Sequence, residues 1–282
     1  MNISNCSKLF DLINFQDSKI TLKIKGIGYN DILHNGTEHS FKSFNNITQI
    51  IINGKQQDII SYRYYFNQTD NVVELIFDDG LTNCQYMFYS CCNITEIDLS
   101  NFNTSKITSM GAMFLGCSSL ISLDLSRFDT SKVRDMFWMF HNCSSLTSLN
   151  LSNFNTSQVA NLDSMFRGCS NLEYINLNNF VEINLNPEIN YYQNMFLNVP
   201  DNVVICIKEN NTNSKIFSQI SLKKCNVIDC TNDWKLKQKK IINNNNECIE
   251  SCENSKQYQY EYNGKCYDNC SQGFLYDKII IK

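Results

Sequence analysis

Hydrophobic residues recur along the middle of the chain with a fixed period. Met-Phe pairs stand 26 residues apart, and a last pair follows 30 residues later. The pairs begin at Met87, Met113, Met139, Met165 and Met195. A fixed period of this size is typical of repeat folds in which each unit packs on its neighbours. We therefore predict a solenoid over residues 72–207, with Val72–Phe77 as the first strand of a shortened first turn.

The segment from Leu120 to Cys143 illustrates one repeat unit. Its first leucines fit the L-x-x-L-x-L pattern of a leucine-rich strand, with one face inward. Polar residues suited to capping a helix follow at 129–131. Apolar residues then recur at spacings of three and four, which favours an amphipathic helix; they are Val133, Met136, Met139, Phe140 and Cys143. The predicted fold class is α/β, a leucine-rich-repeat solenoid with a parallel strand ladder and one short helix per turn.

The N-terminal region alternates apolar and polar residues from Lys19 to Lys25, as half-buried strands do. Further strands are expected at Thr48–Ile52, Ser61–Phe66 and Val203–Ile207. We predict three parts: a β-rich N-terminal cap at 1–71, the solenoid at 72–207, and a small disulfide-rich tail at 208–282. Residues 1–18 carry no assignable pattern, and disorder is one interpretation.

Cysteines also follow the 26-residue period, at Cys91, Cys117, Cys143 and Cys169. Adjacent units would lie ~4.8 Å apart, and parallel Cβ vectors would keep the Cβ atoms at that same distance. This Cβ separation exceeds the one usual for a disulfide. We predict buried thiols that act as small hydrophobic groups. Stacked disulfides and a catalytic cysteine are the alternatives. Catalysis is disfavoured because the chain has three histidines and no acid–base or nucleophile constellation, so we expect neither an enzyme nor a cofactor.

Seven of the 14 cysteines fall after residue 200, among few apolar runs. Such a segment normally needs disulfides or a metal. A C-x3-C spacing without a nearby histidine gives weak support for zinc, so we expect no metal site. A sequential pairing scheme, with Cys270 left over, uses Cys206 with Cys225, Cys230 with Cys248, and Cys252 with Cys266. The odd count, the lack of a visible signal peptide and the abrupt end suggest a fragment of a longer extracellular protein.

The repeats resemble a known family. The segment Cys143–Ser157, CSSLTSLNLSNFNTS, and the segment Met113–Leu120 are similar to the 26-residue repeats of BspA-like leucine-rich-repeat surface proteins. The tail, at Asn263–Tyr267 and Cys270–Gly273, resembles the furin-like cysteine-rich modules of protist surface proteins. This resemblance implies a leucine-rich-repeat solenoid, adhesion to host or matrix proteins, and no catalytic residues. The asparagine-rich composition points to a protist.

In such a strand the residues between the leucines face outward, on the concave side, where repeat proteins bind partners. The candidate contact residues are Glu96, Asp98, Ser122, Asp124, Ser148, Asn150, Tyr174 and Asn176. A solvated ladder without a ligand is the alternative. Asp98 and Asp124 would be stacked like charges, which a cation could relieve.

We therefore expect a non-catalytic adhesion or protein-recognition module, extracellular or on the cell surface and monomeric. Its partner would be a host or matrix protein or a glycan. The alternative is an intracellular leucine-rich-repeat scaffold with reduced cysteines. A net charge of −4 provides no electrostatic footprint for nucleic acid. No apolar stretch approaches the ~20 residues of a membrane span.

Overall fold

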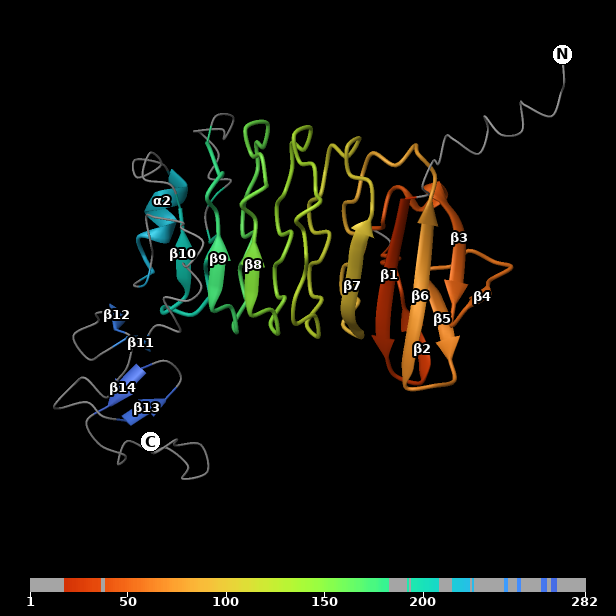
Figure 1. The fold of residues 1–282 in the computed structure, drawn as a ribbon, viewed down its shortest axis with the longest axis horizontal. Coiled ribbons are helices and arrows are strands. Elements are labelled where there is room, and N and C mark those ends of the chain that lie inside the picture. The colour runs from red at the N-terminus through yellow and green to blue at the C-terminus, as the bar shows by residue number, and fades with distance from the viewer. Residues whose placement is uncertain are drawn as a thin grey trace, which may run out of the picture.

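The computed structural model describes residues 18–36, 39–182, 192, 194–207, 215–223 and 225, and the backbone of four short strands between 241 and 267. Three sheets and a stack of repeat units make up the part that carries side chains (Figure 1). The N-terminal sheet has five strands in the order β4-β3-β6-β1-β7, and the second sheet has three in the order β10-β9-β8.

All pairings in the five-stranded sheet are antiparallel. Its strands are β1 (Ser18–Lys25), β3 (Ile47–Ile52), β4 (Lys55–Gln56), β6 (Asp70–Phe77) and β7 (Ile94–Asn101). In β1 the apolar side chains are buried and the lysines between them point outward, because alternate residues of a strand face opposite sides. A separate two-stranded sheet pairs β2 (Gly28–Asp31) with β5 (Arg63–Phe66), and η1 (Phe44–Asn46) precedes β3. The strands predicted in this region are confirmed.

Strand β1 joins this sheet to the first repeat unit. It lies between β6 and β7, so β6 pairs with β1 and β3 and does not stack alongside β7. Lys23 lies opposite Glu96 and forms an ion pair with it at 2.6 Å. The boundary expected between residues 71 and 72 falls inside β6.

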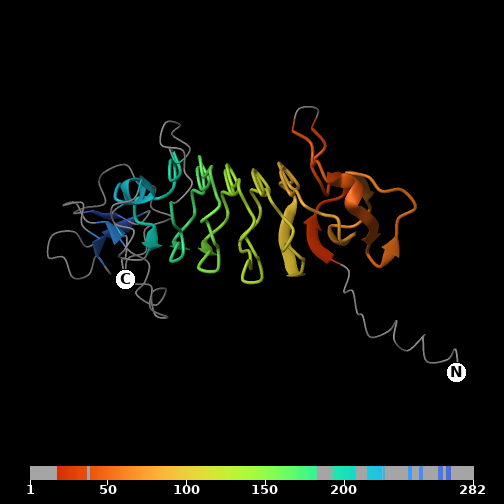
Figure 2. The ribbon, with the colours of Figure 1, turned by 90° about the horizontal axis from the view of Figure 1, so that it is seen from above.

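The 26-residue units stack side by side (Figure 1). On one side, β8 (Ser148–Asn150), β9 (Tyr174–Asn176) and β10 (Val204–Cys206) pair in parallel. On the other side, parallel bridges link equivalent residues of successive units: Asn83, Ser109, Asp135 and Asn161. Figure 2 shows the two sides, with the β7 arrow on one and the narrow turns of the units on the other. We call these the strand side and the turn side.

Buried aromatic rings form columns between the two sides. Phe140 is fully buried and stacks on the rings of the units before and after it, with centroids 5.7 and 5.9 Å away. The column consists of Phe88, Phe114, Phe140, Phe166 and Phe196. A second column consists of Phe77, Phe102, Phe128 and Phe154. These contacts explain why the period is strict, since each ring needs an equivalent ring in the next unit.

The predicted fold class, an α/β leucine-rich-repeat solenoid with one short helix per turn, is wrong. Residues 82–182 contain no helix, and the largest sheet is antiparallel. The expected helices are pairs of tight turns, because two residues four positions apart in each unit adopt positive φ, as Trp138 (53°) and Asn142 (59°) do. A positive φ interrupts a right-handed helix. Two successive turns also place apolar residues at spacings of three and four, which is why the pattern resembled a helix.

The repeat cysteines are confirmed as free, buried thiols. Each of three donates to a carbonyl oxygen of the preceding unit: Cys117 Sγ to Phe88 at 3.2 Å, Cys143 Sγ to Phe114 at 3.1 Å, and Cys169 Sγ to Phe140 at 3.0 Å. Burial raises the pKa of Cys169 to about 12. These thiols therefore serve packing, and their burial makes them unreactive.

The C-terminal part contains α2 (Lys215–Ile220), the α-helix among the described residues. Cys206 and Cys225 are both disulfide-bonded. A four-stranded sheet follows in the order β12-β11-β14-β13. Its strands are β11 (Ile241–Ile242), β12 (Cys248–Ile249), β13 (Tyr260–Tyr262) and β14 (Lys265–Tyr267). Cys230 and Cys252 lie outside the described residues, as do the side chains of Cys248 and Cys266. Among the described residues, no helix has the length and apolar character that a membrane crossing requires.

Replacing Phe140 by alanine should lower the free energy of unfolding by roughly 3–5 kcal/mol, because it removes a fully buried ring from the middle of a stack. Urea unfolding followed by circular dichroism measures this loss. The control Ile121→Ala, at a side chain that is 58% exposed, should stay within ~0.5 kcal/mol of the unchanged chain. A loss below ~1 kcal/mol for Phe140→Ala would contradict the assigned packing.

Replacing Gly168 by alanine should cost at least ~1–2 kcal/mol, since its φ is 76° and the new Cβ would overlap Asn142 Oδ1. Asn142→Gly alone should be nearly neutral, because glycine occupies the equivalent position at Gly116 and Gly168. In the Asn142→Gly background, Gly168→Ala should cost less, since the overlap is gone. Urea unfolding measures the loss of stability caused by Gly168→Ala in each background. An equal loss with and without Asn142→Gly would argue against the described turn.

Candidate functional site

The residues predicted to bind a partner lie on the strand side. Glu96 and Asp98 belong to β7, Ser148 and Asn150 to β8, and Tyr174 and Asn176 to β9, while Ser122 and Asp124 lie in a segment without a regular strand. Asn176 is buried, with 6% of its surface exposed. Ser148 and Tyr174 are half-buried, and the others are exposed.

Four of these side chains have a structural role. Asp98 Oδ1 accepts the backbone N–H of Ser100 at 2.9 Å, and Asp124 Oδ1 accepts that of Ser126 at 2.9 Å. Asn150 and Asn176 accept the equivalent N–H groups of Ser152 and Asn178. An Asp or Asn oxygen that bonds two residues on closes a turn. These hydrogen bonds lower the pKa of Asp98 and Asp124. Asn150 and Asn176 are also the last residues of β8 and β9, and the column presents fewer free groups than predicted.

The two stacked carboxylates have no third potential metal ligand beside them among the described residues. The hydrogen bonds from Ser126 lower the pKa of Asp124, and the opposite effect of the Asp98 charge is smaller. No group of three or more potential ligands gathers anywhere in the part of the chain that the structure describes. The cation considered as an alternative gains no support.

A different surface stands out on the turn side. It consists of rings from the first and third repeat units and from the segment after β2, and we call it the aromatic surface: Tyr86, Tyr89, Phe137 and Trp138 with His34, His39 and His141. The residues Tyr86, Ala112 and Leu115 form a buried cluster separate from the main core, and Tyr89, Phe137 and Trp138 pack against it half-buried. This surface was missed in the sequence.

The rings of the aromatic surface touch in one continuous series. His34 lies 4.3 Å from Tyr89, and Tyr89 lies 6.2 Å from Tyr86, between centroids. Tyr86 also stacks on His39 and meets Phe137 edge-on at 5.9 Å. The series continues from Phe137 to Trp138 and from Trp138 to His141, at 5.3 and 6.1 Å. All three histidines of the chain therefore belong to it.

The turns of the repeat units hold the aromatic side chains in place. Tyr86 and Trp138 occupy the same left-handed position in their units, and Ala112 occupies it in the unit between them. Phe137 lies over Gly111 so closely that a Cβ there would overlap the ring. The indole N–H of Trp138 donates to Asp163 Oδ2 at 3.1 Å. Small residues in the middle unit thus allow the rings on either side to meet.

The histidine segment is anchored to the first unit. Its flanking residues Ile32 and Leu33 are buried in the main core. The backbone N–H of His34 donates to the carbonyl of Met87 at 2.9 Å. Figure 2 shows the red segment after β2 rising on the turn side, beside the yellow first unit.

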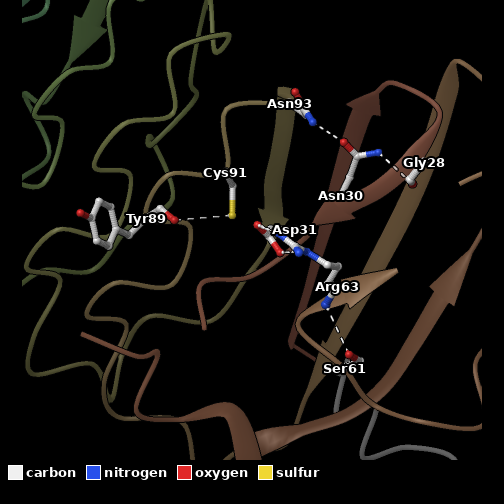
Figure 3. A network of polar contacts seen from close by, with 8 residues as sticks. All are labelled: Gly28, Asn30, Asp31, Ser61, Arg63, Tyr89, Cys91 and Asn93. Atoms are coloured by element: carbon white, nitrogen blue, oxygen red, sulfur yellow. Dashed lines mark hydrogen bonds and ion pairs between the residues drawn. The ribbon is translucent and has the colours of Figure 1, made fainter. Parts of the chain in front are cut away.

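A polar network supports the base of this segment (Figure 3). Asn93 of the first unit donates to the Asn30 side-chain oxygen, and Asn30 in turn donates to the carbonyl of Gly28 at 3.2 Å. Asp31, at the end of β2, forms a two-bond ion pair with Arg63 at 2.6 and 2.9 Å. The network fixes β2 against the stack, so the histidines that follow it meet the tyrosines in a defined place.

Comparison of the repeat units with one another could have found this surface. The buried positions keep Met, Phe and Cys in the four units spaced by 26 residues, whereas the position of Trp138 holds Tyr86, Ala112 and Ser164 in the other three. The position of His141 varies likewise, with Tyr89, Leu115 and Arg167. Stacking requires the same residue types at the buried positions, whereas the positions of Trp138 and His141 are free to differ between units. Variation between units therefore marks the turn side.

Burial sets the titration of His34 and His141. It lowers the pKa of His34 and of His141, and Arg167 lowers the pKa of His141 further. The neighbouring charges oppose this shift only in part, namely Asp31 at His34 and Asp163 at His141. His141 Nδ1 is buried without a hydrogen-bond partner among the described residues. Both rings are therefore neutral at about pH 7.5, given an ordinary value of about 6.5.

Residues 82–202, less than half of the chain, match the family described as "Mycoplasma protein of unknown function, DUF285". No curated protein and no solved structure matches the chain. The match, together with the missing helices, corrects the resemblance to BspA-like leucine-rich-repeat surface proteins with a furin-like tail. The repeats resemble DUF285 instead.

Acid should destabilise the fold through His34 and His141. A folded-state pKa below the unfolded value means that the folded chain binds fewer protons, so stability is complete above about pH 6.5 and declines as the pH falls. The urea midpoint should therefore drop between about pH 7.5 and pH 5.5. The double variant His34→Gln/His141→Gln should show a smaller drop. An equal drop in the variant and the unchanged chain would contradict the assignment.

Proposed function

We propose that this chain is a non-catalytic protein-recognition module and that the aromatic surface binds its partner. The observation that carries the proposal is the continuous series of rings around the buried Tyr86, in which Tyr89, Phe137 and Trp138 are half-buried and hold positions that differ between otherwise similar units. Tyr and Trp are enriched among the residues that dominate binding energy at protein interfaces. The rings are also held by turns, by the Trp138–Asp163 hydrogen bond and by the Asn30–Asn93 contact. Such preorganisation reduces the entropy lost on binding.

The strand side is a weaker candidate. Its Asp and Asn oxygens accept backbone hydrogen bonds, and Asn176 is buried. Breaking those bonds to contact a partner would cost free energy. Tyr174 and Ser122 could still contribute, which the experiment below tests.

We further propose that the module works outside the cell or at the cell surface, on a host or matrix protein. Support comes from Cys206 and Cys225, because disulfides persist in oxidising compartments. The repeat thiols are compatible with such a compartment, since burial raises their pKa and shields them.

The test is an array of matrix proteins and glycans probed with the intact chain, followed by affinity measurements on the partner that binds. Trp138→Ala and Tyr89→Ala should each weaken binding at least about tenfold, as loss of a central aromatic residue does. The strand-side control Ser122→Ala should change the affinity less than about twofold. Circular dichroism confirms that each variant folds. Retention of binding by Trp138→Ala, with loss in an Asp124→Ala/Tyr174→Ala variant, would place the binding surface on the strand side instead.

A further inference from the structure

Cationic side chains accompany the aromatic surface. Arg134 is exposed at the start of the turn segment that carries Phe137 and Trp138. Arg167 holds the position of His141 in the next unit and lies close enough to affect the pKa of that histidine. Neither arginine forms an ion pair among the described residues, whereas Arg63 is paired with Asp31. The two guanidinium groups therefore add positive charge beside the rings on a chain of net charge −4.

The carboxylates beside these rings are already engaged. Asp163 accepts the Trp138 indole N–H. Asp135 accepts the backbone N–H of Phe137 at 3.3 Å and faces the Gln85 amide at 3.5 Å, and burial raises its pKa. The charged groups left for a partner are therefore the guanidinium groups of Arg134 and Arg167, beside the aromatic rings.

We propose that the aromatic surface binds an acidic segment of a protein that also carries aromatic or large apolar side chains. In this arrangement Arg134 and Arg167 pair with carboxylates of the partner, and the partner's apolar side chains pack on Trp138, Phe137 and Tyr89. Arginine suits this role because its planar group forms two parallel bonds with a carboxylate and also stacks on rings. The inference rests on the proposed function and names the chemistry of the partner for the same surface.

The experiment uses the intact chain and short synthetic peptides measured by fluorescence anisotropy at low salt. The first peptide alternates glutamate and phenylalanine, the second has lysine in place of glutamate, and the third has glutamine. A sulfated oligosaccharide is the fourth probe. The glutamate peptide should bind at least about tenfold tighter than the lysine peptide, with an affinity that falls as salt rises.

The variant Arg134→Glu/Arg167→Glu should remove this preference, and the milder Arg134→Gln/Arg167→Gln should reduce it. The control is Arg127→Glu, which makes one Arg→Glu exchange, half the charge change of the double variant, at an exposed arginine outside the aromatic surface. It should leave the preference within about twofold. Unchanged urea midpoints confirm that these surface variants fold.

Two results separate the failure of this inference from that of the proposed function. Trp138-dependent binding that favours the lysine peptide or the oligosaccharide, or that is the same for all three peptides, would overturn the acidic partner and leave the recognition surface in place. Binding that Trp138→Ala does not affect, or no binding of any probe, would overturn the inference together with its surface.

Discussion

Hydrogen bonds between neighbouring units determine the form of the repeats. On the turn side, alternate backbone N–H groups donate to the next unit, as Phe114 does to Met139 at 3.0 Å and Gly116 to His141 at 2.8 Å. A buried N–H group must find an acceptor, and here that acceptor is the next unit rather than the preceding turn of a helix. The left-handed residues aim the backbone groups outward along the stack, so the turns and the stacking depend on each other.

Side chains extend this system beyond the turn side. The buried hydroxyl of Thr130 accepts the N–H of Asn155 at 2.7 Å and donates to the carbonyl of the same residue at 3.1 Å. Thr156 repeats the arrangement toward Val181. The buried thiols of Cys117 and Cys143 donate to the backbone carbonyl groups of Phe88 and Phe114 in the preceding units. Each repeated polar residue thus satisfies the backbone of a neighbour, while the rings supply the apolar contact.

Much of the architecture could be predicted from the sequence. The period, the buried Phe and Cys columns and the strands at β1, β3 and β6 follow from patterns that burial imposes on any fold. The helices could not be excluded, because spacings of three and four fit a helix and a pair of tight turns equally well. Left-handed φ at Ala112 and Trp138 carried no warning, since these residue types seldom adopt it. The antiparallel β1–β7 pairing joins residues about 75 positions apart, which local patterns do not report.

The candidate site was harder still. Outward-facing residues of the strands were expected to bind, yet Asp98 and Asp124 close turns, and this requires knowing where the backbone bends. The aromatic surface brings His34 next to Tyr89 and Tyr86 next to Phe137, contacts that exist only after the units stack. Its side chains look unremarkable one at a time. Their arrangement on the turns gives them a shared role.

The central claim is that the turns of each unit bond to the next unit. Scalar couplings across hydrogen bonds, measured by NMR on the isotope-labelled chain, test it most directly. The account predicts a coupling between the amide nitrogen of Phe114 and the carbonyl carbon of Met139, which belong to adjacent units. A coupling from the Phe114 nitrogen to the carbonyl of Met110, as in an α-helix, would contradict it.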